Sequence, residues 1–440
     1  MRQVVAAVLL GLGLGGCVTA SPIDDPAPPP TAFPTIRPSS AAGTVQAPSA
    51  GATATVWHAA GATVAGTVSL DVDPVAVDIG APAAWLLAAP TADAGTLWVA
   101  VHDDGSVTAV TIGSQGAVRD VDVGARRTAT TRPPALHAPD GEWLLVEAHD
   151  DAAEFAGVLP LGDGRTVTVT TAGDLLVTTP GSAFPERHPG PYLPDARPIR
   201  VDDRRVALLF GPTDRYEHAV LGDGIEATQA RIVDVTAGTV SDTVVPEGRV
   251  IEGLHPLVGD LTGDGNLDVV VTTSAESDGA RLEAWLLAGR GRRFGPAIGQ
   301  PGRWRHQIAI APTGPDGEVE VVEVVTPHLD RVATFWQAGD QLLVATGDVP
   351  DAVVSHRIGS RSMEDAAVID VDGDGIRELV GPATDGGLAV VRHRVDDTMV
   401  ESLAVPTPES NIAIAELPGD RAALGYVTAD GLLVVWVGRA

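Results

Sequence analysis

The sequence predicts an all-β protein, and within that class a β-propeller of seven blades. Three observations favour this fold. The 440 residues include 50 glycines and 34 prolines, which suits a chain with many turns. From about residue 53 onward, short runs of β-branched and apolar residues alternate with glycine and aspartate turns, and no amphipathic helical pattern extends over three turns. One pattern, an acidic or glycine turn between two apolar runs, also repeats along the chain.

The first element along the chain is a segment for export. It has a basic start at Arg2, an apolar run from Val4 to Leu14, and Leu14-Gly15-Gly16-Cys17 at its end. This is the layout of a secretory signal peptide, and the apolar run is too short to span a bilayer as a helix. The last four residues resemble the bacterial lipobox, whose cysteine is acylated and becomes the new N-terminus. We therefore expect residues 1–17 to be a lipoprotein signal peptide with Cys17 as the lipidation site.

The next element, residues 18–52, is predicted to be a disordered linker rich in Pro, Ala, Ser and Thr. After an acylated cysteine, such a linker acts as a stalk that attaches the folded part to the membrane through the lipid. The expected location is the cell envelope. Val18 rather than Asp follows the cysteine, which favours the outer membrane if the cell has one. Because Cys17 is the single cysteine of the chain, an intramolecular disulfide is excluded.

The folded part is predicted to comprise residues 53–440, in seven repeat units. Each unit is aligned on one turn residue, and these turn residues are Pro82, Asp140, Asp203, Asp264, Asp316, Asp374 and Asp420. Units of this length have room for four strands, which indicates the blades of a propeller. The last unit supplies only three strands. We expect the surplus N-terminal runs Thr53–His58 and Thr63–Asp71 to complete its sheet and to close the ring.

Two of the turns carry the residue spacing of a calcium loop. Calcium prefers about six to eight oxygen ligands, so a short loop has to direct several carboxylates inward. Oxygens at alternate positions 1, 3, 5, 7 and 9 do this, and a glycine at position 6 permits the sharp turn. The candidate ligands of the first loop are Asp260, Thr262, Asp264, Asn266 and Asp268, and those of the second are Asp370, Asp372, Asp374, Ile376 and Glu378. Position 12 holds Val271 and Gly381 instead of Glu, which excludes an EF-hand.

These two segments resemble the FG-GAP or VCBS repeats of integrin-like propellers. The resemblance implies a seven-bladed ring in which calcium loops join the first two strands of some blades, with Ca²⁺ as a structural ion. Two positions depart from the family pattern. Thr262 replaces an acidic ligand, which lowers the charge of the first loop, and Glu378 is longer than the usual Asp.

The charge and the remaining motifs limit the function. The net charge of −29 argues against nucleic acid as a partner, because phosphate binding needs basic patches. No catalytic residue is predicted, and the expected function is a non-catalytic binding or scaffold protein for an unknown protein or carbohydrate. Two alternatives remain open: a propeller enzyme acting on polysaccharide, as a lyase or a hydrolase, and a structural envelope component. Trp304, between two arginines, is expected to be an exposed aromatic residue of a binding face.

Overall fold

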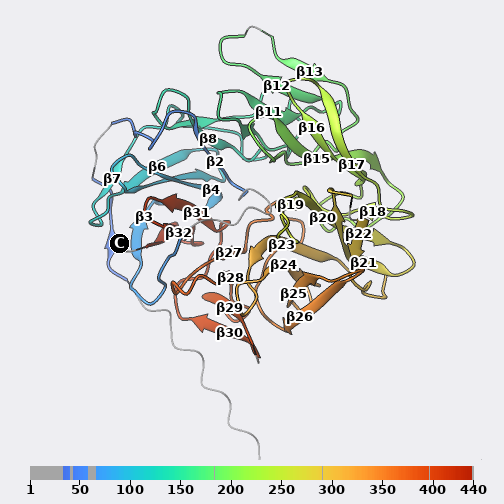
Figure 1. The fold of residues 1–440 in the computed structure, drawn as a ribbon. Helices are drawn as coiled ribbons and strands as arrows, with labels where there is room; N and C mark the ends of the chain where they lie inside the picture. Colours follow the sequence, from blue (N-terminus) through green and yellow to red (C-terminus); the bar gives the residue numbers. More distant parts are fainter. Residues whose placement is uncertain are drawn as a thin grey trace, which may run out of the picture.

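The protein is built from strands alone throughout the part of the chain that the computed structural model describes, residues 33–39, 43–57, 66–182, 184–289, 291–395 and 397–438. These residues form 33 strands and no α-helix. The strands group into small antiparallel sheets that follow one another around a ring (Figure 1). The predicted all-β propeller is confirmed.

Successive antiparallel meanders, numbered here in chain order, make up the ring. Meander 1 contains β4 (Ala83–Pro90), β5 (Thr96–His102), β6 (Val107–Ile112) and β7 (Val118–Asp120). Meander 2 contains β8 (Ala135–Ala138) and β9 (Leu144–Val146), with β2 (Ala52–Thr55) added at the edge of β8. Meander 3 contains β10 (Leu159–Pro160), β11 (Thr166–Val169), β12 (Leu175–Thr178) and β13 (Glu186–His188). Meander 4 contains β14 (Ile199–Arg200), β15 (Arg205–Thr213), β16 (Glu226–Asp234) and β17 (Thr239–Val244).

The second half of the chain continues the same plan. Meander 5 contains β18 (Val250–Ile251), β19 (Leu257–Gly259), β20 (Asp268–Ala275), β21 (Gly279–Leu286) and β22 (Gly291–Phe294). Meander 6 contains β23 (Arg305–Pro312), β24 (Val319–Val325), β25 (Val332–Ala338) and β26 (Leu343–Val349). Meander 7 contains β27 (Ala367–Ile369), β28 (Glu378–Pro382), β29 (Leu388–Arg394) and β30 (Asp397–Leu403). Meander 8 contains β31 (Ala413–Leu417), β32 (Arg421–Val427) and β33 (Leu432–Val437), joined by β3 (Val75–Asp78) and β1 (Thr35–Ile36).

The predicted number of seven blades is not confirmed, because the described strands form eight meanders in seven hydrogen-bonded sheets. One nine-stranded sheet contains both meander 4 and meander 5, which are connected where β16 pairs with β18. The repeat alignment missed the turn at Asp163 between β10 and β11, since this turn lacks the spaced acidic pattern and follows closely on the turn at Asp140. It also placed the first turn at Pro82, whereas β4 and β5 are joined by residues 91–95.

The two ends of the chain meet in meander 8, as predicted. β3 pairs antiparallel with β33 from Val75↔Val435 to Asp78↔Leu432, and β1 adds in parallel to β3. The N-terminal segment that closes the ring is, however, Val75–Asp78 and not the expected runs. Of the first expected run, Thr53–Thr55 pairs with β8 in meander 2 as part of β2. Of the second, Thr67 forms an isolated bridge to Arg421 in meander 8 but does not join the sheet as a strand. Val77 is fully buried against meander 1, which explains why this short strand is held in place.

Part of the predicted linker is packed on the propeller. Thr35–Ile36 forms β1 in meander 8. Isolated bridges then join Ser39 to Arg119 and Thr44 to Asp122 beside meander 1, and Gln46 to Glu142 in meander 2. Val45 is buried there. The linker is therefore shorter at its C-terminal end than composition predicts. The signal peptide and Cys17 lie outside the described residues, and within those residues no helix is long and apolar enough to cross a membrane.

The hydrophobic core lies between the faces of neighbouring sheets. One cluster, which contains Trp98, joins meanders 8 and 1. A second, which contains Trp436, joins meanders 7 and 8. A third, which contains Phe335, joins meanders 6 and 7. The first strands of successive meanders also contact one another, as β31 contacts β4 and β23 contacts β27, so these strands line the axis of the ring. Each sheet is thus stabilised by its two neighbours.

Overpacking the contact between meanders 8 and 1 should weaken the ring. A Cβ at Gly425 on β32 would lie 2.7 Å from the Trp98 ring and 3.0 Å from the Val434 carbonyl oxygen. We expect Gly425→Ala to lower the free energy of unfolding by about 1–3 kcal/mol, measured by urea denaturation. Gly43→Ala is the matched control, because nothing lies within 4 Å of a Cβ there. Equal stability of the two variants would contradict this account of the contact between meanders 8 and 1.

Candidate metal loops, central pocket and histidine cluster

The two predicted calcium loops occupy equivalent places in meanders 5 and 7. The first joins β19 to β20 and the second joins β27 to β28, so both follow the strand that lines the ring axis. Asp268 and Glu378, at position 9 of their loops, are the first residues of β20 and β28 and are buried. The structure therefore brings the members of each predicted set together on one loop.

In the second loop, three carboxylates converge. Asp370, Asp372 and Asp374 each offer one oxygen, and these oxygens lie within 4.8 Å of one another. Asp370 organises the turn, since its Oδ1 accepts the N–H of Gly373 at 2.6 Å and its Oδ2 accepts the N–H of Gly375 at 3.2 Å. Both glycines have positive φ, which is the reason that this sharp turn needs them. Among the described residues, this is the one place where three acidic, histidine or cysteine ligand atoms come together in this way.

The remaining positions of the second loop are less exposed. Ile376 donates its N–H to Asp374 Oδ1 at 2.8 Å. Glu378 is fully buried, and its Oε2 accepts the N–H of Val371 at 3.0 Å. Burial raises the pKa of the Glu378 carboxyl to about 7.

Two arginines of β29 lie against the acidic loop, a feature that sequence spacing did not reveal. Arg394 Nη2 is 3.1 Å from Glu378 Oε1, 3.3 Å from Asp374 Oδ2 and 3.5 Å from Asp372 Oδ2. Arg392 Nε lies 3.5 Å from Asp372 Oδ2. A cation bound here would compete with Arg394 for these oxygens, so the site is less negative than its four carboxylates suggest.

The first loop has fewer carboxylates but an unsatisfied oxygen. Asp260 accepts the N–H groups of Asp264 at 3.0 Å and Gly265 at 2.7 Å, and Asp268 accepts that of Leu261 at 3.0 Å. The hydroxyl oxygen of Thr262 is buried and has no hydrogen-bond partner. A buried polar atom without a partner costs free energy, and a hard cation would satisfy it. The donor set of this loop therefore fits calcium.

Asn266 and Asp268 complete the first loop. The N–H and the side-chain amide of Asn266 both donate to Asp264 Oδ1, at 2.8 and 3.1 Å. Burial raises the pKa of the Asp268 carboxyl to about 6.

The second loop also holds the N-terminal segment. Thr67 Oγ1 donates to Asp370 Oδ2 at 3.0 Å, and the N–H of Val68 donates to the Asp370 carbonyl at 2.9 Å. Thr67 further pairs with Arg421 in meander 8. Asp370 therefore connects the loop to the segment that leads into β3.

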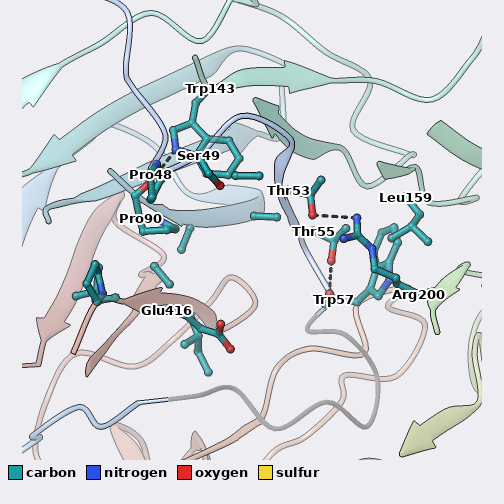
Figure 2. Close-up of a pocket in the computed structure, with 17 residues that line it drawn as sticks. Pro48, Ser49, Thr53, Thr55, Trp57, Pro90, Trp143, Leu159, Arg200 and Glu416 are labelled. Atoms are coloured by element: carbon teal, nitrogen blue, oxygen red, sulfur yellow. Dashed lines mark hydrogen bonds between the residues drawn. The ribbon is translucent and has the colours of Figure 1, made fainter. Parts of the chain in front are cut away.

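A pocket of about 540 Å³ opens at the ends of β4 and β31, two of the strands that line the ring axis (Figure 2). Its walls come from β2, from the ends of β4 and β31, and from Trp57 and Trp143. Most of the lining is alanine, proline or another apolar residue. The charged residues of the lining are Arg200, which donates to Thr53 Oγ1 at 3.0 Å, and Glu416, which is exposed. Sequence reasoning missed this pocket because small residues from distant parts of the chain carry no local signal.

A histidine cluster lies at the other end of the strands that line the axis. We use this name for His218, His255, His306, His328, His356 and Trp304. His306 is the second residue of β23, while His255 and His356 precede β19 and β27, so the cluster lies on the face opposite the metal loops. Trp304 is only 3% exposed, and the prediction of an exposed aromatic residue there was wrong. Its ring stacks against His306 and His328, with centroids 5.1 and 6.2 Å away.

Burial keeps four of these histidines, His255, His306, His328 and His356, uncharged at neutral pH. It lowers the pKa of His255 to about 4 and that of His356 to about 4, and it lowers those of His306 and His328 as well. Near His255, the Glu364 carboxylate raises the pKa and the Arg197 guanidinium lowers it, both less than burial does.

Comparisons with known proteins find solved structures similar to the chain but no matching family model and no matching curated protein. The resemblance of the two loops to FG-GAP or VCBS repeats therefore stays a prediction. Solved structures similar to it include BamB from Moraxella catarrhalis, at 14% identity and a TM-score of 0.43 over 83% of this chain and 97% of that chain. A chain of a mitotic checkpoint complex matches at 11% identity and a TM-score of 0.44, over 83% and 94% of the two chains. BBS1N, from its complex with ARL6DN, matches at 10% identity and a TM-score of 0.43, over 88% and 97%.

Acid should destabilise the protein through His255. The pKa of this residue is about 4 in the folded state and about 6.5 in an unfolded chain. The unfolded state therefore takes up a proton first as the pH falls from 6.5 towards 4, and stability is lost in that window. Between pH 7 and pH 5, we expect the free energy of unfolding to fall by about 2 kcal/mol less in His255→Gln than in the wild type.

Urea denaturation at the two pH values measures this difference. Buried carboxyls with raised pKa values, such as Glu226 and Asp365, stabilise the folded state as the pH falls. They are present in the wild type and in the variant, so they do not affect the difference between the two. His149→Gln, at a partly exposed histidine in a turn, should keep the wild-type pH dependence. An identical pH dependence in all three proteins would refute the assignment.

Proposed function

We propose that this chain is an exported, lipid-anchored β-propeller that calcium stabilises and that binds a partner without catalysis. The observation that carries the calcium part is the geometry of the two loops. Three carboxylates converge in the second loop, and the buried Thr262 hydroxyl in the first has no partner. Calcium bound there would act as a structural ion that ties β19 to β20 and β27 to β28. The lipobox ending at Cys17 supports export and anchoring at the cell envelope, in the outer membrane where the cell has one.

A binding role is supported by the central pocket. Its described lining contains one carboxylate, Glu416, and no histidine, cysteine or tyrosine. Acid–base or nucleophilic catalysis uses such groups in proximity, whereas a mostly apolar lining with few polar groups is typical of binding. The proposed ligand is a protein segment or a carbohydrate.

Calcium should raise the thermal stability of the full chain. With a dissociation constant of about 0.1 mM and about 1 mM calcium, each loop adds roughly 1.4 kcal/mol. We expect a higher melting temperature with calcium than with EGTA. Asp264→Asn and Asp374→Asn should each lose about half of this increase, because asparagine can still accept the turn hydrogen bond but has no charge.

The matched control is Asp316→Asn, in the equivalent turn of meander 6. That turn has Pro312 and Gly314 at positions 1 and 3, so this substitution should leave the calcium response unchanged. A melting temperature that does not respond to calcium in the wild type would refute the metal assignment and leave the propeller assignment intact.

Lipidation should depend on Cys17 alone. In a bacterial host supplied with a clickable fatty acid, the wild type should incorporate the label and fractionate with membranes. Cys17→Ser should lose both properties, because serine has no thiol for the diacylglycerol transfer. Retention of the label in Cys17→Ser would exclude this cysteine as the anchor.

A further inference from the structure

We propose that His328 and His356 form a second metal site, for a borderline divalent cation such as Zn²⁺, on the face opposite the calcium loops. His328 lies between β24 and β25, and His356 lies between β26 and β27. His328 Nε2 is 2.8 Å from His356 Nδ1. Two nitrogens bound to one tetrahedral Zn²⁺ lie about 3.3 Å apart, given Zn–N bonds of about 2.0 Å. A small movement of the half-buried His328, with its ring proton shifted from Nε2 to Nδ1, would therefore admit the ion.

The protonation pattern of His356 fits a ligand. Its Nε2 lies 2.9 Å from the Ser360 carbonyl oxygen. A carbonyl can only accept, so Nε2 carries the proton and Nδ1 presents its lone pair to His328. Metal-binding histidines usually donate the other ring N–H in this way, which fixes the tautomer and orients the ring.

Neighbouring rings hold the pair in place. Trp304 lies edge-on to His356 at 5.2 Å and is stacked with His328, and its own indole N–H is buried without a partner. His306, adjacent to both, has its Nδ1 3.0 Å from the hydroxyl of Ser355. A site built on rings packed in this way is already organised before the ion binds.

The charges around the pair permit a cation. The two guanidinium groups that lower the pKa of His356 are each paired with a carboxylate: Arg197 with the buried Glu364, and Arg357 with Asp365 at 3.6 Å. The imidazoles themselves are neutral at pH 7, as the lowered pKa values indicate. Among the described residues, no third acidic, histidine or cysteine ligand atom converges with these two within 4.8 Å. Water would therefore complete the coordination, and imidazole ligands favour Zn²⁺ or Cu²⁺ over Ca²⁺.

The test is a titration of the chelator-treated full chain with Zn²⁺, using protein purified without a histidine tag. Millimolar calcium is kept in the buffer so that the acidic loops are saturated and do not contribute. We expect one Zn²⁺ per chain by calorimetry. The affinity should fall at least tenfold in His328→Gln and in His356→Gln, and it should be unchanged in His149→Gln.

Absence of Zn²⁺ binding to the wild type would overturn the proposal, since the contact would then be a plain hydrogen bond between two imidazoles. Unchanged binding in His328→Gln would overturn it as well. His328 is half-buried in a loop, so that variant decides the question even if His356→Gln, at a fully buried position, does not fold. Co²⁺ provides an independent readout, because its visible absorption spectrum changes when ring nitrogens replace water and should not change in His328→Gln.

Discussion

The pairing of β3 with β33 is the constraint on which the rest of the structure depends. A row of sheets that pack face to face leaves two unprotected ends unless the first and last sheets are joined. Here four residues of an N-terminal strand complete the last sheet, and the cluster around Trp98 then fills the space between meanders 8 and 1. The central pocket exists only because of this closure, since its walls include β4 from meander 1 and β31 from meander 8.

Strand direction divides the molecule into two chemically different faces. β19 and β27, which line the axis, begin on the face of the histidine cluster and end on the face of the acidic loops. One face therefore has hard oxygen donors held by backbone N–H groups, as around Asp260 and Asp370. The other has neutral ring nitrogens packed around Trp304. Because oxygen and nitrogen donors prefer different cations, the calcium and zinc sites that we propose would not compete for the same ion.

The features that the sequence could predict are those encoded locally. The spacing of Asp260 to Asp268 and of Asp370 to Glu378 lies within single turns, and the structure has those turns in the expected place between strands. The strand content was equally accessible, because β-branched runs bounded by glycine are a local signal. The number of repeats was harder to predict, because the turn at Asp163 lacks the acidic pattern on which the alignment relied.

Arg394, the histidine cluster and the central pocket depend on contacts between residues far apart in the chain, and no single segment records them. Trp304 shows the same limit: two flanking arginines suggested exposure, but the loops that cover it come from other meanders.

The way in which the ring closes has a consequence for biogenesis. β3 and β33 pair with each other although almost all of the described strands lie between them in the chain. Contacts of such high sequence separation form slowly, so we expect the sheets to assemble into an open, crescent-like arrangement before the ring closes. In that arrangement the strand edge of β33 and the apolar face around Trp98 are uncovered, which makes it prone to aggregate.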